Sequence, residues 1–357
     1  MLAYFNSTRD RISIFLKSFL EEKRPQLARV NPLGPDAADR LLDFALQGKM
    51  IRGCLVALGY ALAGAASVPA TPEVTIAAGA AMELFQSGLL VHDDIMDRDL
   101  TRRGRSTLFQ QYAELAAREG RADPGHSGEA LGICAGDVAY FLAFELLAGL
   151  DAPPAALQKV IALSARELTA VGVAQMQDVA WGASHAEVKD EDILRMYTYK
   201  TSRYTFSLPL MTGGILAGAA PGLLDLLETF GETTGSMFQI RDDELGLYGD
   251  ERELGKPVGS DVREGKKTLF YSSLMARVSA EERQRLERIF GNRDSSEADL
   301  AYVRDLAVAR GVSASVEGVA RGLEAKARDL IGRIRTGTEA DRGALGDLLD
   351  YTMARKR

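Results

Sequence analysis

The chain has 357 residues, 46% of them apolar and 26% charged, and a formal net charge of −7 at pH 7. The length allows either about two domains or one large all-helical domain, and the composition is that of an ordinary soluble globular protein. The acidic balance argues against nucleic acid and against an anionic membrane surface as general partners.

Three features of the sequence bear on the compartment. Both cysteines, Cys54 and Cys134, stand in apolar surroundings, which predicts buried thiols in a reducing compartment. The start of the chain lacks a basic segment followed by an apolar one. The most membrane-like run, 74–91, contains Glu83 and two other polar side chains, which predicts a buried core helix rather than a membrane span. We therefore expect a cytoplasmic protein.

Apolar residues at helical spacing dominate the chain. They predict loops at 32–35 and 120–128, and helices over 10–27, 37–45, from Pro72 to the aspartates near residue 97, 129–147, 154–181, 223–247 and much of the chain after Ser279. We find no strand-like alternation of any length, no linker of low complexity and no repeat. The sequence therefore predicts a single all-α domain over residues 1–357, a bundle of long helices around a central cavity.

A small cationic element precedes the long helix. Lys49 and Arg52 follow Gly48 and are three residues apart, so we expect them to project from one helical face. Two solvated surface cations are the alternative, and the pair by itself favours that alternative.

Three aspartates end the helix that starts at Pro72. Asp93 and Asp97 are four residues apart and share one helical face, with Asp94 turned away from them. Like charges at this spacing destabilise a helix unless a cation lies between them. A few carboxylates suit Mg²⁺, which keeps several waters and takes its remaining ligands from phosphate.

A second acidic pair, Asp242 and Asp243, lies on a later helix that also presents Gln239 on the same face. Two aspartate-bearing helices that face each other would clamp a diphosphate through magnesium. The alternative is a pair of solvated acidic helix ends.

Two arginines follow the first aspartates, in Arg102-Arg103-Gly104. A guanidinium binds phosphate oxygens bidentately, and we expect a flexible turn here. Adjacent arginines point in different directions, so each can serve a different anion. The alternative is that they neutralise the aspartates.

The ordered set of motifs resembles the trans-isoprenyl (polyprenyl) diphosphate synthase family. That family has, in this order, GKxxR, DDxxD followed by RRG, a KT pair, FQxxDD and GKP…EGK. The corresponding residues here are Gly48-Lys49…Arg52, 93–97, 102–104, Lys200-Thr201, 238–243, 255–257 and 264–266. The resemblance implies a bundle of long helices whose aspartate motifs face each other across a deep pocket.

The resemblance also implies an enzyme that condenses isopentenyl diphosphate with an allylic diphosphate, works as a homodimer and needs several Mg²⁺ ions bound with the substrate diphosphate. Direct metal ligands would be Asp93, Asp97 and Asp242, with Asp94 and Asp243 in support.

Substrate contacts follow from the same resemblance. The allylic diphosphate would be held by the metal ions and by Arg102, Lys200 and Lys256, with Lys266 nearby. Isopentenyl diphosphate would be held by Lys49, Arg52, Gln86 and Arg103. Thr201 and Gln239 would turn their dipoles toward the developing allylic cation, next to Lys200.

One departure and two alternative functions bear on this reading. Gly246 stands where the family usually has a third aspartate, so we expect weaker metal affinity rather than loss of activity. A terpene cyclase shares the fold but does not need the second diphosphate site. A non-catalytic synthase subunit usually lacks aspartates of the first motif, and this chain keeps all three.

The family resemblance extends to product length. The growing chain would run from Asp93 past Leu89 and Gly88 toward Phe85. We expect Gly88 to leave its level of the pocket open and Leu89 to narrow it partly, so that Phe85 sets a twenty-carbon product, geranylgeranyl diphosphate. Farnesyl diphosphate or a longer chain is the alternative, and Phe85 could instead face the core.

Overall fold

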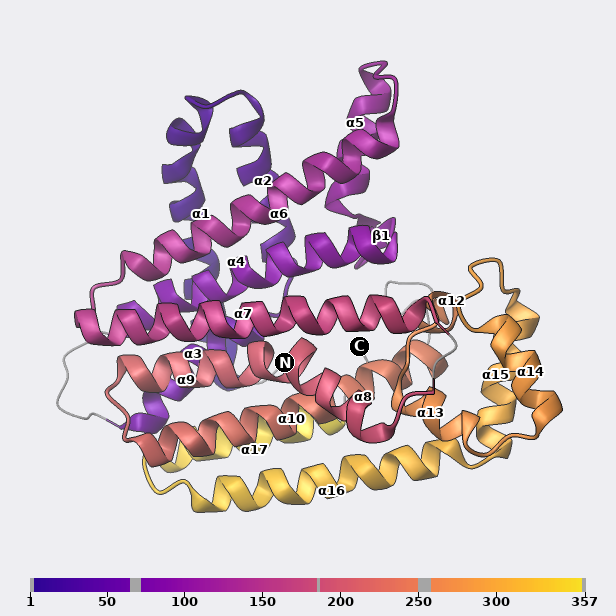
Figure 1. Ribbon diagram of the computed structural model, residues 1–357. Coiled ribbons are helices and arrows are strands. Elements are labelled where there is room, and N and C mark those ends of the chain that lie inside the picture. The colour runs from indigo at the N-terminus through magenta and orange to yellow at the C-terminus, as the bar shows by residue number, and fades with distance from the viewer. Residues whose placement is uncertain (1–2, 65–71, 185–186, 250–257, 355–357) are drawn as a thin grey trace. The chain divides into compact units, whose positions relative to one another are not determined.

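The computed structural model describes residues 3–64, 72–184, 187–249 and 258–354 (Figure 1). In these ranges the chain is almost entirely helical, and the strands found there form one short hairpin, so the all-α prediction is confirmed. The chain divides into two compact units that alternate along the sequence. Unit 1 takes Met1–Leu163, Pro209–Leu224 and Thr336–Ala344, and unit 2 takes Ser164–Leu208, Asp225–Arg335 and Leu345–Arg357.

Unit 1 contains most of the N-terminal elements. They are η1 (Ala3–Phe5), α1 (Asn6–Ala28), α2 (Leu33–Leu46), α3 (Ile51–Ala63), α4 (Pro72–Asp97), β1 (Thr101–Arg102), β2 (Arg105–Ser106), α5 (Leu108–Arg118), α6 (Pro124–Ala148), the first part of α7 (Pro154–Gly182), nearly all of α9 (Leu208–Leu216) and the first residues of α10 (Pro221–Tyr248) and α17 (Glu339–Met353).

Glycines bring α4 and α6 into close contact. A Cβ added to Gly88 on α4 would lie 2.7 Å from Cε1 of Tyr140 and 2.9 Å from the carbonyl oxygen of Gly136, both on α6. A Cβ on Gly136 would overlap the His92 ring of α4. These close approaches explain why glycine stands at two positions inside long helices, where it otherwise lowers helix stability.

In the described part of the chain, two helices, 73–97 and Pro124–Ala148, are long and apolar enough to cross a membrane by length and composition. The apolar part of the first is 78% buried, so the prediction of a core helix over 74–91 is confirmed. The second is α6, and its apolar part is only 44% buried. Its outward face carries Ile133 and Phe141 beside the half-exposed carboxylates of Asp137 and Glu145.

Unit 2 holds the remainder of α7 and α10 and most of the C-terminal elements. They are α8 (Asp190–Tyr197), the π-helix η2 (Thr198–Ser207), α12 (Ser260–Glu264), α13 (Leu269–Met275), α14 (Ala280–Ile289), α15 (Glu297–Ala309), α16 (Val312–Arg333) and the end of α17. Capping boxes at Ser279 and Ser296 begin α14 and α15. One apolar core, which includes Ile240, Leu269 and Leu300, joins α10 to the C-terminal helices.

Three local predictions are wrong. The segment 120–128 is not all loop, because Pro124 opens α6 and the Asp123 side chain accepts a hydrogen bond from the His126 amide at 3.0 Å. The segment 32–35 is not a loop either, since α2 begins at Leu33. Cys54 is buried as expected, but Cys134 is exposed on the outer face of α6.

Candidate functional site

Asp93, Asp94 and Asp97 lie at the C-terminal end of α4, which ends in a Schellman motif. Arg98 adopts the left-handed conformation (φ 59°), and its amide donates to the Ile95 carbonyl at 3.2 Å. The Asp99 amide donates to the Asp94 carbonyl at 2.8 Å. Carboxylates at a helix C-terminus meet the negative end of the helix dipole, so this turn needs a cation nearby.

Arg102 supplies that cation. Its Nε donates to Oδ1 of Asp94 at 2.5 Å, and its Nη2 lies 3.6 Å from Oδ2 of Asp93. Burial raises the pKa of the Asp94 carboxyl to about 7, although Arg102 acts to lower it. The other oxygen of Asp94, Oδ2, is buried without a hydrogen-bond partner. Arg102 therefore lies where it neutralises the aspartates, as the alternative expected of both arginines.

The segment that carries both arginines is a tight hairpin, so the predicted turn is present. Arg102 pairs with Arg105, which leaves a two-residue loop of Arg103 (φ 53°) and Gly104 (φ 74°). Positive φ at both positions is the type I′ turn that fits the twist of a hairpin. The Arg103 guanidinium points to Gly48, where an added Cβ would lie 3.7 Å from Nη1. The two arginines thus diverge, as predicted.

The cationic element around Lys49 differs from the prediction of one helical face. Met50 is buried in the left-handed conformation (φ 53°), and α3 begins only at Ile51. Lys49 therefore precedes the helix and Arg52 lies in its first turn. A left-handed residue between them sets the two side chains independently of helical spacing.

Glu83, which the sequence reasoning did not assign, lies beside these cations. It is 5% exposed on α4, and its Oε1 accepts a hydrogen bond from the Gly53 amide at 2.8 Å. Burial raises the pKa of the Glu83 carboxyl, while the charges of Arg52 and Arg103 oppose the increase. The sequence signal that could have indicated Glu83 is a charged residue inside an apolar run, three residues before Gln86. Gln86 itself is half-buried on α4.

Unit 2 places Lys200, Thr201 and Gln239 in two sets of polar contacts. Lys200 on η2 forms an ion pair with Asp178, a buried residue of α7 to which the sequence reasoning gave no role. Thr201 Oγ1 donates to Oε1 of Gln239 at 2.8 Å, and Nε2 of Gln239 donates to Oδ1 of Asp243 at 2.8 Å. The predicted common face of Gln239 and Asp243 on α10 is confirmed.

Asp243 is held by the protein through both oxygens. The Tyr197 hydroxyl donates to Oδ2 and itself accepts from the Leu269 amide at 3.0 Å. Burial, with a further contribution from Asp261, raises the pKa of Asp243 well above its ordinary value. Asp242 is only half-buried. Tyr197 was missed because nothing in the sequence pairs it with a residue on a later helix.

The absence of a side chain at Gly246 leaves space for the carboxylate of Asp261. A Cβ at this position would lie 2.6 Å from Oδ2 of Asp261 on α12. Lys266 Nζ lies 3.7 Å from Oδ1 of Asp261 and 2.7 Å from Oε2 of Glu264. A cavity of about 20 Å³, enough for one water, reaches from these groups to the core of unit 2. Lys256 lies outside the described residues.

Within the described ranges, no group of three or more His, Cys, Asp or Glu side chains stands ready to hold a metal ion. The donor atoms near each aspartate motif are carboxylate oxygens, and one of them, Oδ2 of Asp94, is buried and unpaired. This chemistry fits Mg²⁺, which binds through one or two carboxylates and completes its shell with water and substrate phosphate.

The expectation that Gly88 leaves an open level is wrong, because Tyr140 and Gly136 fill the space above it. Phe85 is 2% exposed, and its ring meets that of Phe144 on α6 edge to face, with 4.9 Å between centroids. This packing is what the alternative in which Phe85 faces the core expects, and the role of Phe85 in product length stays a prediction. Leu89 is half-buried.

Comparison with known proteins gives a consistent result. A family model described as polyprenyl synthetase matches residues 37–307. The geranylgeranyl diphosphate synthase of Sulfolobus acidocaldarius is 29% identical over 99% of this chain and 98% of its own. The (2E,6E)-farnesyl diphosphate synthase of Mycobacterium tuberculosis is 31% identical over 87% of this chain and 80% of its own.

A solved structure is similar over nearly the whole chain. It is the geranylgeranyl pyrophosphate synthase of Corynebacterium glutamicum, in complex with isoprenyl diphosphate and magnesium. The TM-score is 0.91 and the identity 29%, over 99% of this chain and 98% of that one.

Proposed function

Since the chain belongs to the polyprenyl synthetase family of prenyltransferases, we propose that it is a Mg²⁺-dependent enzyme that condenses isopentenyl diphosphate with an allylic diphosphate and releases diphosphate. One observation carries the proposal. In each aspartate motif one carboxylate is buried and held by the protein, Asp94 by Arg102 and Asp243 by Tyr197 and Gln239. The remaining aspartates are only half-buried.

This division supports Asp93, Asp97 and Asp242 as direct ligands of Mg²⁺, with Asp94 and Asp243 in support. The bound ions would neutralise the leaving diphosphate and so favour ionisation of the allylic C–O bond. The magnesium in the Corynebacterium glutamicum complex supports the choice of metal.

Fixed cations complete the binding of the two diphosphates. Arg102, Lys200, Lys256 and Lys266 are the proposed contacts of the allylic diphosphate. Lys49, Arg52, Gln86 and Arg103 are the proposed contacts of isopentenyl diphosphate. The divergence of Arg102 and Arg103 from one hairpin supports this assignment, because each guanidinium can bind a different anion.

Thr201 and Gln239 are the proposed groups that stabilise the allylic cation. The Thr201 proton is committed to Oε1 of Gln239. The remaining surface of the Thr201 oxygen therefore carries lone pairs, which attract a positive charge. After the new carbon–carbon bond forms, we propose that the released diphosphate accepts the proton lost in the final elimination.

The proposed product is geranylgeranyl diphosphate, with farnesyl diphosphate or a longer chain as the alternative. The name of the Sulfolobus acidocaldarius relative supports it, and that of the Mycobacterium tuberculosis relative supports the shorter alternative. Incubation with isopentenyl diphosphate, an allylic diphosphate and Mg²⁺, followed by chromatography of the dephosphorylated products, is expected to give a twenty-carbon alcohol. Diphosphate release without condensation would indicate a terpene cyclase. Absence of turnover would indicate a non-catalytic subunit.

The two diphosphate sites are expected to separate kinetically. Arg103→Ala should mainly raise the KM for isopentenyl diphosphate, and Arg102→Ala should mainly impair use of the allylic substrate. Each loses a charge-assisted contact of about 1.5–3 kcal/mol. Steady-state kinetics with each substrate varied in turn measures the split. An identical defect in both variants would refute the assignment.

Three broader proposals accompany the reaction. We propose that residues 1–357 form one synthase domain, which the family match across both units supports. A homodimer is supported by the outward apolar residues of α6, such as Phe141, which is 72% exposed. A cytoplasmic protein without a membrane span is supported by the buried apolar part of α4 and by the carboxylates on the outer face of α6.

A further inference from the structure

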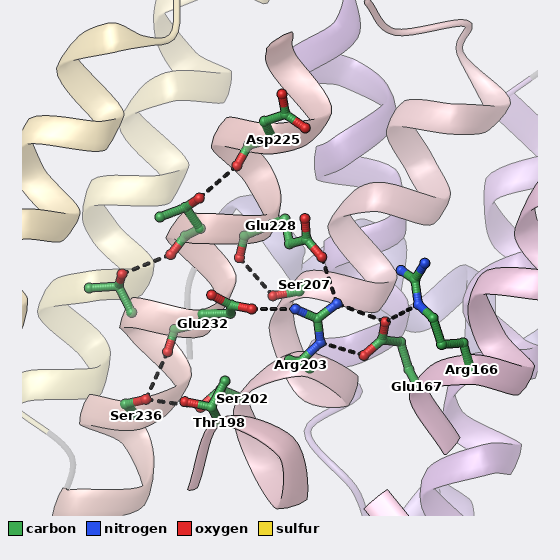
Figure 2. Close-up of polar contacts among 12 residues, drawn as sticks. Arg166, Glu167, Thr198, Ser202, Arg203, Ser207, Asp225, Glu228, Glu232 and Ser236 are labelled. Atoms are coloured by element: carbon green, nitrogen blue, oxygen red, sulfur yellow. Dashed lines mark hydrogen bonds and ion pairs between the residues drawn. The ribbon is translucent and has the colours of Figure 1, made fainter. Parts of the chain in front are cut away.

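The π-helix η2 contacts α10 through residues that are five positions apart. Ser202 Oγ lies 3.2 Å from Ser236 Oγ, and Ser207 Oγ donates to the Glu228 carbonyl at 2.8 Å (Figure 2). Tyr197, five residues before Ser202, reaches the second aspartate motif on the same helix. In an α-helix residues five apart point about 140° from each other. In a π-helix, with its i→i+5 hydrogen bonds, they share a side.

Two glycines of α10 let η2 approach at backbone distance. A Cβ at Gly235 would overlap the Cα of Ser202, and a Cβ at Gly231 would lie 2.5 Å from the Ser207 amide nitrogen. The same row of η2 that makes the polar contacts therefore also packs against backbone. A change of helical register in η2 would break both kinds of contact together.

Arg203 ties η2 to the helices on either side of it (Figure 2). Its Nε and Nη2 donate to the two oxygens of Glu167 on α7 at 2.6 and 2.8 Å. On α10, Nη2 donates to Oε1 of Glu228 at 2.5 Å, and Nη1 donates to Glu232. A planar guanidinium makes such bidentate contacts in one fixed orientation.

The charges in this cluster make Arg203 hard to replace. Glu167 is 2% exposed and also accepts a hydrogen bond from Arg166 at 3.1 Å. Burial is the largest single influence and would raise the pKa of Glu167, but the hydrogen bonds and charges of Arg203 and Arg166 together outweigh it, and the pKa is lowered. Glu167 is thus a buried anion, and without Arg203 it would lose its principal partner.

Arg203 follows the proposed catalytic residues directly on η2. We propose that Arg203 is a positioning residue: by fixing the register of η2 between α7 and α10, it holds Thr201 at Gln239 and Lys200 at Asp178. This inference rests on the proposed function of Thr201 and Lys200. The contacts of Arg203 are with Glu167, Glu228 and Glu232, so the proposed effect acts through the π-helix.

Removing Arg203 without leaving the buried Glu167 as an unpaired charge separates positioning from stability; Glu228 and Glu232, which also lose Arg203, are only partly buried. The variant Arg203→Gln alone should melt at a lower temperature, because Glu167 stays charged and buried. The double variant Glu167→Gln/Arg203→Gln removes one charge of each sign, so its melting temperature should recover most of that loss. Neither variant has the planar guanidinium by which Arg203 holds η2 to α7 and α10.

The double variant is expected to lower kcat about tenfold to a hundredfold, since small misplacements of catalytic groups have effects of this size. The KM for isopentenyl diphosphate should not change, because its proposed contacts lie in unit 1. Amides of 198–207 should exchange hydrogen faster than in the parent. Arg203→Lys keeps the charge without the fork and should give an intermediate kcat.

A matched control is Asp36→Asn/Arg40→Gln, which removes another partly buried ion pair, of 2.8 Å, in unit 1. It should lower the melting temperature and leave kcat unchanged. A double variant at Glu167 and Arg203 that keeps the parent kcat and the parent exchange rates would overturn the positioning role. If the parent protein shows no turnover, the proposed function fails. Unchanged hydrogen exchange of the amides of 198–207 in the double variant would still refute the positioning role of Arg203.

Discussion

Asp93→Ala and Asp242→Ala are each expected to lower turnover about a thousandfold, because a bound metal contributes several kcal/mol to transition-state stabilisation. Both residues are half-buried, and neither belongs to the apolar core. The fold should therefore survive, with circular dichroism like that of the parent. Titration with Mg²⁺ and inorganic diphosphate should show weaker binding in each variant by calorimetry.

Asp305→Ala is the matched control, since Asp305 is an exposed aspartate on α15. It should keep both turnover and metal binding. Parent-like activity of Asp93→Ala at ordinary Mg²⁺ concentrations would rule out Asp93 as a metal ligand. The same outcome for Asp242→Ala would remove the second motif from the proposed site.

The second large effect concerns folding. Gly88→Phe is expected to prevent unit 1 from folding, because the new ring would have to enter space that Tyr140 and the Gly136 backbone already occupy. Gly88→Ala should lower the free energy of unfolding by about 1–3 kcal/mol, the usual effect of an overpacked core. Thermal melting and the yield of soluble protein measure both.

Gly322→Phe provides the comparison, since no atom lies within 4 Å of the Cβ position of Gly322 on α16. That variant should fold normally. If Gly88→Phe folded with the parent melting temperature and gave shorter products, Gly88 would line the product pocket after all. Leu89, which is half-buried, is the better position at which to narrow the pocket.

Long helices were predictable because their signals are strong and local. The predicted helix 154–181 nearly coincides with α7, and 223–247 with α10, since prolines open both and apolar periodicity sustains both. The hairpin at 101–106 was not predictable from alternation, because strands of two residues are too short to show any. The π-helix was missed for a related reason, because its i→i+5 hydrogen-bond pattern does not follow the period of 3.6 residues that predicts an α-helix.

The charged motifs were predictable in kind, since their residue types and order limit the chemistry. Their partners were not. Arg102 with Asp94, Lys200 with Asp178 and Tyr197 with Asp243 join separate helices or a helix and a hairpin. Such pairs depend on how the helices pack, which a single sequence does not state.

Gly88 shows the same limit for packing. A glycine in an apolar helix has two readings, an open space or a close neighbour. The second holds here, because α6 crosses α4 at that point.

Three non-glycine residues in the described ranges have left-handed backbone, and all three lie within or directly after the cationic and acidic motifs of unit 1: Met50, Arg98 and Arg103. Each such residue costs roughly 1–2 kcal/mol of strain. Directed evolution that selects only for heat resistance would thus favour substitutions at these positions, where glycine or asparagine relieves the strain. At Arg98, to which no substrate contact is assigned, such a substitution would raise stability without removing a proposed substrate contact. At Arg103 it would remove a proposed substrate cation, so only a screen that also demands turnover would retain the arginine.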